Sequence, residues 1–167
     1  MKFRVALAAA ATLLFCCAPV EAAGALEPAS ARATPPLVAN TLAGNELRLT
    51  DFRGRVVLVN FWATWCAPCV AEMPSLSRLR DKLGAARAEV IAVNFQENAA
   101  RIEPFMRNLG IAFPTIRDHD GSLRKAWDVT IFPTTFVIAP NGRIAYVAVG
   151  EIDWDDPTVE LRLRSLR

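Results

Sequence analysis

The 167-residue chain is poor in residues that build metal sites. It has one histidine, His119, and four cysteines, of which Cys16 and Cys17 lie in an N-terminal segment typical of a signal peptide. A structural zinc site takes about four Cys or His ligands, so no metal is expected. No run of basic residues stands out among 19 Lys and Arg against 17 Asp and Glu, so nucleic acid is not an expected partner.

The N-terminal segment has the three parts of a secretory signal. Lys2 and Arg4 precede an apolar run over residues 5–18, and small residues up to Ala22 suit a signal peptidase. The apolar run is shorter than the ~20 residues that a membrane span needs. We therefore predict a signal peptide over residues 1–22, with an N-terminal membrane anchor formed by residues 5–18 as the alternative. Both outcomes predict an exported, periplasmic protein.

The rest of the chain divides into a linker and one domain. Residues 23–36 are rich in Ala, Pro, Ser and Arg without a usable period, which predicts a linker. Residues 37–167 suit one domain in length and composition. Once the signal peptide is removed, Cys66 and Cys69 are the remaining cysteines, in a compartment where disulfides form.

Strand and helix patterns alternate in the first half of the domain, and a hairpin and a helix end it. The alternation predicts parallel strands joined by crossovers, and Pro140-Asn141-Gly142 predicts an antiparallel pair. The sequence therefore predicts an α/β fold with a mixed β-sheet flanked by helices on both faces, an α/β/α sandwich. The expected strands are 37–41, 46–49, 56–61, 89–95, 112–116, 134–139 and 143–149, and the expected helices are 66–83, 102–109, 123–127 and one that starts after Asp156.

The Cys66-Ala67-Pro68-Cys69 motif follows a predicted buried strand and opens a predicted helix. As a structural staple it would contribute little, because the entropy that a disulfide removes grows with the length of the closed loop. At a helix N-terminus, unpaired N–H groups and the helix dipole stabilise a thiolate and lower its pKa. The position therefore favours a redox pair over a structural disulfide.

The segment "NFWATWCAPCVAEMPSL", residues 60–76, resembles the active-site segment of thioredoxin-fold proteins, and specifically of the TlpA/ResA-like exported thiol–disulfide oxidoreductases. Pro74 and a "FPTTF" element at 132–136 strengthen the resemblance, which extends from about Leu37 to the C-terminus. It implies a thioredoxin-like fold with an inserted strand–helix segment, which fits 89–109. No cofactor is expected.

The resemblance implies roles for individual residues. Cys66 would be the exposed nucleophile that attacks a substrate disulfide, and Cys69 the resolving thiol. Pro133 would be a cis-proline that faces the cysteine pair. It would bring the Phe132 backbone beside Cys66, where a substrate strand could pair.

Residues around the motif are candidates for substrate binding. Trp65, next to the first cysteine, offers an apolar surface to a substrate polypeptide, and Pro68 limits the freedom of the loop between the cysteines. Trp127 is expected in the core. Trp154 lies in an acidic loop and receives no role.

Position 60 departs from thioredoxin, which has a buried aspartate six residues before the first cysteine. Asn60 cannot take a proton, and Glu72 is the candidate substitute, because the TlpA/ResA-like group carries a carboxylate there. Glu72 follows Cys69 by three residues, so both lie on one side of the helix. A partly buried carboxylate has a raised pKa and can exchange a proton with the resolving thiol. A surface glutamate without a role is the alternative.

These inferences predict a periplasmic thiol–disulfide oxidoreductase that reduces protein disulfides. The resemblance suggests roles such as apocytochrome c maturation, with electrons from a membrane thiol donor of the DsbD/CcdA type. The direction stays open, because C-x-x-C proteins range from strong reductants to strong oxidants, although Ala67-Pro68 resembles the reductant end.

Two alternatives also stay open. A peroxiredoxin-like thiol peroxidase would need a threonine and an arginine near its reactive cysteine, and Thr64 is close in sequence. A non-enzymatic copper- or thiol-binding module would favour a wider cysteine spacing and a histidine.

Overall fold

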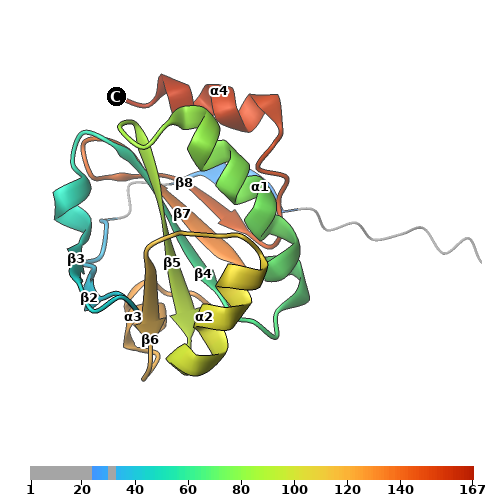
Figure 1. The fold of residues 1–167 in the computed structure, drawn as a ribbon. Helices are drawn as coiled ribbons and strands as arrows, with labels where there is room; N and C mark the ends of the chain where they lie inside the picture. Colours follow the sequence, from blue (N-terminus) through green and yellow to red (C-terminus); the bar gives the residue numbers. More distant parts are fainter. Residues whose placement is uncertain (1–23, 30–32) are drawn as a thin grey trace, which may run out of the picture.

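The computed structural model describes residues 24–29 and 33–167, and its centre is a six-stranded mixed β-sheet (Figure 1). The expected signal peptide and anchor lie outside the described residues. Within these residues, no helix has the length and apolar character needed to cross a membrane. The strands are β1 (Leu26–Pro28), β2 (Val38–Asn40), β3 (Glu46–Arg48), β4 (Val56–Trp62), β5 (Ala88–Phe95), β6 (Thr115–Asp118), β7 (Thr134–Ile138) and β8 (Ile144–Val149).

The sheet has the strand order β1-β8-β7-β4-β5-β6. β4, β5 and β6 are parallel, whereas β7, β8 and β1 join by antiparallel pairing, and β2 and β3 form a separate hairpin. The parallel half comes from the alternating strands and helices, and the antiparallel half from the hairpin at Pro140-Asn141-Gly142. This is the thioredoxin-like α/β fold that the sequence predicts.

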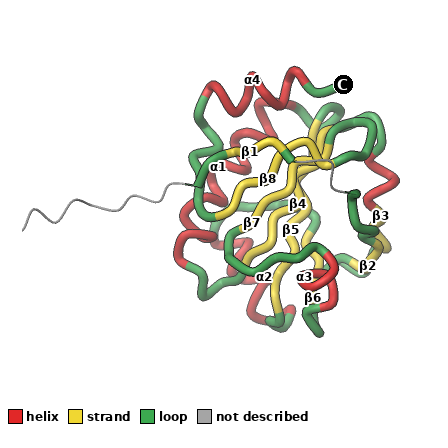
Figure 2. The backbone as a smooth tube through the Cα atoms, turned by 180° about the vertical axis from the view of Figure 1, so that it is seen from behind, coloured by secondary structure: helices red, strands yellow, loops and turns green. Residues whose placement is uncertain are grey.

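Two layers cover the sheet (Figures 1 and 2). α1, α2 and α4 pack on one face through a large apolar cluster, and α3, the 3-10 helix η1 and the β2–β3 hairpin pack on the other. Trp127 is fully buried in the second cluster, as predicted. The helices are η1 (Leu49–Phe52), α1 (Ala67–Leu83), α2 (Ala99–Asn108), α3 (Ser122–Ala126) and α4 (Pro157–Ser165).

β4 is the central strand, and all of its residues are buried. Since side chains alternate across a strand, Leu58 packs in the α1-side cluster while Val59 and Phe61 pack in the other. Asn60 lies on the same side as Leu58. β4 thus directs one amide side chain toward the helix that follows the cysteine motif.

The prediction of a linker over residues 23–36 is wrong at Leu26–Pro28, which form the strand β1. Leu26–Pro28 pairs with β8, with Leu26 opposite Ala148, and the Leu26 side chain is 6% exposed within the core cluster. A three-residue strand with one inward apolar residue has no period to detect. Its pairing is decided by the free edge of β8, which the local sequence does not reveal.

β6 also differs from its prediction at 112–116, because it starts at Thr115. Pro114 has no N–H group to donate to the ladder, so regular pairing begins after it. At the C-terminus, Asp156 caps α4 by accepting a hydrogen bond from the Thr158 N–H at 2.7 Å, as predicted.

Leu26→Ala is expected to lower the free energy of unfolding by about 2 kcal/mol, because it leaves a cavity beneath the edge of the sheet. Leu161→Ala is the matched control, since Leu161 is 67% exposed on α4, and its effect should stay within about 0.5 kcal/mol. Urea denaturation of both variants measures the difference. Equal losses in the two variants would show that β1 adds nothing specific to the core.

Candidate active site

The cysteine motif lies where β4 ends and α1 begins. Cys66 is the N-cap residue of α1, and its sulfur accepts a hydrogen bond from the Cys69 N–H at 3.3 Å. Cys66 and Cys69 form a disulfide with an S–S distance of 2.06 Å. The first sulfur therefore lies at the end of the helix where free N–H groups favour negative charge.

The two cysteines differ in their contact with solvent. Cys66 is 6% exposed and Cys69 is fully buried, whereas Ala67 and Pro68 between them are exposed. The prediction that Cys66 is exposed is therefore wrong for this oxidised form, because the disulfide turns its sulfur toward the buried Cys69. Cys66 is still the cysteine of the pair that reaches the surface.

The Phe132–Pro133 peptide bond is cis, as predicted. The next residue, Thr134, pairs with Phe61 near the end of β4, so Pro133 lies at the edge of the sheet from which the motif emerges. The Phe132 ring packs edge-on against Trp65, with ring centroids 6.0 Å apart. The cis-proline Pro133 and the cysteine motif, which contains Pro68, thus meet at the C-terminal end of β4.

Exposed apolar side chains lie along this edge. Trp65 is 59%, Ile131 54% and Val149 49% exposed. Ile131 precedes the cis bond by one residue, and Val149 lies opposite Thr134 in the β7–β8 ladder. Sequence reasoning found Trp65 but missed the other two, because their proximity follows from the β7–β8 pairing. Exposed apolar residues that gather at one place commonly mark a binding surface.

Glu72 is buried, at 2% exposure, so the alternative of a surface glutamate is wrong. Its Oε1 accepts a hydrogen bond from Asn60 Nδ2 at 2.8 Å, and Asn60 Nδ2 also donates to Thr135 Oγ1. Its Oε2 accepts from Trp154 Nε1 at 3.2 Å and from the Ile152 N–H at 3.4 Å. Burial raises the pKa of Glu72 to about 7, although these hydrogen bonds act in the opposite direction.

A second carboxylate holds the loop that precedes the motif. Glu97 Oε2 accepts from the Thr64 N–H at 2.7 Å and from Asn94 Nδ2 at 2.8 Å, while its Oε1 contacts Thr64 Oγ1 at 2.5 Å and Arg101 Nε at 2.8 Å. Burial raises the pKa of Glu97, but the hydrogen bonds from Thr64 and Asn94 and the charge of Arg101 outweigh it and lower that pKa below its ordinary value. Sequence reasoning missed this network, which joins three separate segments.

The fold and the disulfide can now be compared with known proteins. The model of the AhpC/TSA family matches residues 31–147. The chain belongs to the AhpC/TSA family. It is 36% identical over 133 residues to the thiol-disulfide oxidoreductase ResA of Geobacillus thermodenitrificans, a match that covers 80% of this chain and 75% of that protein.

Solved structures agree with this assignment. A thiol:disulfide interchange protein of the thioredoxin family from Chlorobium tepidum superposes with a TM-score of 0.69 at 27% identity, covering 81% of this chain and 99% of the other. A secreted thiol-disulfide isomerase from Corynebacterium glutamicum gives a TM-score of 0.70 at 26% identity, with 84% and 98% covered. Our AhpC/TSA family member is thus a thiol–disulfide oxidoreductase of the ResA type, and Cys66–Cys69 is its C-x-x-C pair.

The residues that the peroxidase and copper alternatives would use are bound to other side chains or lie away from the cysteine pair. Thr64 and Arg101 do meet, since Arg101 Nε donates to Thr64 Oγ1 at 2.7 Å, but both are also bound to Glu97. Over residues 24–29 and 33–167, no group of three or more His, Cys, Asp and Glu side chains is arranged to hold a metal ion. His119 lies exposed in the turn after β6.

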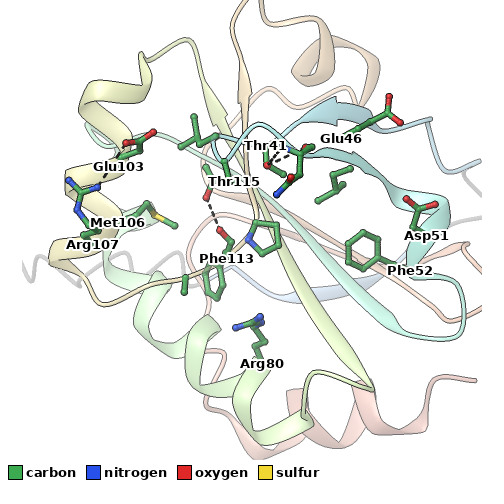
Figure 3. A pocket seen from close by; sticks show the side chains of 16 residues that line it. Thr41, Glu46, Asp51, Phe52, Arg80, Glu103, Met106, Arg107, Phe113 and Thr115 are labelled. Carbon is green, nitrogen blue, oxygen red and sulfur yellow. Dashed lines mark hydrogen bonds and ion pairs between the residues drawn. The ribbon is translucent and has the colours of Figure 1, made fainter.

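A cavity of about 700 Å³ lies between the β2–β3 hairpin, the start of β6 and the end of α2 (Figure 3). Phe52, Met106 and Phe113 give it an apolar lining, and Arg80 and Arg107 lie at its border. None of the predicted site residues lines it. The cavity is therefore separate from the Cys66–Cys69 disulfide and the residues predicted around it.

Glu97→Gln is expected to lower the free energy of unfolding by about 1.5 kcal/mol at pH 7, the effect of losing a hydrogen bond to a charged group. A carboxyl group whose pKa falls on folding stabilises the folded state above its unfolded pKa, and the stabilisation is lost as the pH falls through the folded value. The difference from wild type should therefore vanish in acid, below about pH 4.

Denaturation curves at several pH values measure this difference. Glu103→Gln on α2, the helix that follows Glu97, is the control, because the Glu103 side chain is 47% exposed. A wild-type advantage over Glu97→Gln that persists unchanged in acid would contradict a role for the Glu97 charge.

Proposed function

We propose that the protein is an exported reductase of protein disulfides in which Cys66 is the nucleophile, Cys69 the resolving thiol and Glu72 the group that exchanges a proton with Cys69. The observation that carries the proposal is the buried Glu72 carboxylate, hydrogen-bonded to Asn60 and three residues after Cys69 on α1. Such a carboxylate is costly to bury, which argues for a chemical use.

The reaction balances as a two-electron transfer. The Cys66 thiolate attacks one sulfur of a substrate disulfide, so a mixed disulfide forms and the other substrate sulfur leaves as a thiolate. The Cys69 thiol then gives its proton to the Glu72 carboxylate and attacks the Cys66 sulfur. The Cys66–Cys69 disulfide forms, the second substrate thiolate leaves, and the proton passes from Glu72 to solvent or to a departing thiolate.

The environment of Glu72 suits this exchange. General base catalysis is most efficient when the pKa of the base is near the working pH, and burial raises the pKa of Glu72 to about 7. A carboxyl group with a pKa raised in this way can take up and release a proton near neutral pH. Asn60 supports the ionised form, because its amide N–H donates to the carboxylate.

The surface around Cys66 suits a polypeptide substrate. Trp65, Ile131 and Val149 are exposed apolar side chains beside the disulfide edge, and Pro68 is exposed between the cysteines. A substrate strand would pair with the backbone at Phe132, next to the cis-proline Pro133, and place its sulfur against Cys66. Large aromatic residues such as Trp65 commonly anchor protein contacts.

Export and reduction complete the proposal. The sequence over residues 1–22 predicts secretion or anchoring, and a similar Corynebacterium glutamicum protein is described as secreted. An exported reductase needs electrons from inside the cell, which a membrane thiol donor of the DsbD/CcdA type would supply. Apocytochrome c is the substrate class that the resemblance to TlpA/ResA-like proteins suggests.

Redox titration tests the direction. The midpoint potential of the Cys66–Cys69 pair is expected nearer to about −270 mV, the value for thioredoxin, than to about −120 mV, the value for DsbA. Equilibration with dithiothreitol or glutathione buffers, followed by thiol trapping and mass spectrometry, measures it. Cys69→Ser is the control without a titrating pair. A potential in the DsbA range would refute reduction as the physiological direction.

Glu72→Gln tests the proton exchange. The variant is expected to slow release of the second substrate thiol by about 100-fold, the usual size of a general-base effect. In the wild type the rate should rise through about pH 7 as Glu72 ionises, and this rise should be absent from the variant. Stopped-flow mixing of the reduced protein with a peptide disulfide across pH 5 to pH 9 gives both profiles.

Glu160→Gln on α4 serves as the control for the substitution itself. It should reproduce the wild-type profile, because Glu160 pairs with Arg164 on the surface. An unchanged rise near pH 7 in Glu72→Gln would remove Glu72 from the mechanism while leaving the cysteine roles intact.

A further inference from the structure

The loop between β8 and α4, residues 150–156, closes over the Glu72 side chain. Asn60 on β4 donates a hydrogen bond to Oε1, whereas the loop donates to Oε2 from Trp154 Nε1 at 3.2 Å and from the Ile152 N–H at 3.4 Å. The two carboxylate oxygens are thus held by different parts of the fold. The sheet fixes one oxygen and the loop fixes the other.

Trp154 is fully buried, and its indole N–H can only donate a hydrogen bond. A buried indole N–H needs an acceptor, which Glu72 provides. The hydrogen bond affects the ionisation of Glu72, because a donor that faces a carboxyl group favours its ionised form over its protonated form. Trp154 therefore opposes the effect of burial on Glu72.

Apart from the hydrogen-bond donors, the groups near Glu72 do not favour its ionised form. β4 contributes the neutral Asn60, whose amide also donates to Thr135 of β7, and α1 contributes Cys69 one turn away. Among the described residues, the charge that acts on the pKa of Glu72 is that of Glu151 on the loop, and it raises this pKa as burial does. Among these described groups, the hydrogen-bond donors alone favour a charged Glu72.

The loop is fixed at both of its ends. At its start, the Gly150 N–H donates to the carbonyl oxygen of Pro133 at 2.8 Å. Near its end, Asp155 accepts from Arg78 Nε at 2.8 Å and from Lys82 Nζ at 3.0 Å, both on α1. The loop therefore connects the cis-proline to the helix that carries Cys69 and Glu72, and holds the indole between them.

We propose that Trp154 is a positioning residue, whose indole N–H orients the Glu72 carboxylate and favours its ionised form so that it can take the proton of Cys69. This inference rests on the proposed role of Glu72. It adds that the pH dependence of the enzyme is set by the β8–α4 loop as well as by burial.

Trp154→Phe removes the donor and keeps most of the ring. The midpoint of Glu72 ionisation should move upward by about one pH unit, the shift expected from loss of one hydrogen bond to a charged group. The rise of the thiol-release rate should move by the same amount, so that the rate at pH 7 falls about fivefold. Infrared difference spectra against Glu72→Gln measure the ionisation, and stopped-flow mixing measures the rate.

Two further proteins separate the hydrogen bond from packing. Benzothienylalanine at position 154 keeps the bicyclic shape and lacks the N–H, so it should reproduce the shift even if Trp154→Phe folds poorly. Trp127→Phe is the matched control, because Trp127 is also fully buried but lies in the cluster on the other face of the sheet. Its ionisation midpoint and rate profile should match those of the wild type.

The outcomes separate this inference from the proposed function. If Glu72→Gln abolishes the rise near pH 7 but neither change at position 154 moves the midpoint, Trp154 has no positioning role and the role of Glu72 stands. If Glu72→Gln leaves the rise intact, the proposed proton exchange fails and so does the positioning role that rests on it. An upward midpoint shift and a matching rate shift, both absent from Trp127→Phe, support the inference.

Discussion

The hydrogen bond between Asn60 and Glu72 is the contact on which the rest of the site depends. It joins the central strand to the helix that carries both cysteines, inside a core where an unpaired carboxylate would be strongly unfavourable. An amide at position 60 can donate a hydrogen bond but cannot compete for the proton. The sheet therefore orients the carboxylate, and the ionisable group itself lies on the helix beside the resolving cysteine.

The geometry around this contact comes from strand ends. β4 and β5 are parallel, and β7 is antiparallel to β4, so the C-terminal ends of β4 and β5 lie at the same edge as the N-terminal end of β7. The cysteine motif, Glu97 and the cis-proline Pro133 are all attached to this edge. A thioredoxin-like sheet thus gathers three segments that are far apart in the sequence, and the first turn of α1 adds the positive end of a helix dipole.

The sequence was sufficient for features encoded locally and insufficient for those that depend on long-range pairing. The cysteine pair, the cap at Asp156 and the hairpin before β8 each follow from a few adjacent residues. The role of Glu72 and the cis bond at Pro133 were predicted from the resemblance to TlpA/ResA-like proteins. Trp154 lies 82 residues from Glu72, and nothing in its acidic neighbourhood indicates that its indole faces a buried carboxylate. β1 was missed for the same reason, because its partner is the distant β8.

Two carboxylates near the disulfide show how environment divides their tasks. Glu97 meets Thr64, Asn94 and the charged Arg101, and these partners lower its pKa against the effect of burial, so it stays ionised at working pH and holds the loop before Cys66. Among the described residues, Glu72 meets neutral donors and a like charge on Glu151, so burial prevails and raises its pKa to about 7. A cation beside Glu72 would fix its charge and end its capacity to exchange protons near neutral pH. The neutral character of Asn60 and Trp154 is therefore what allows the second carboxylate to titrate while the first remains structural.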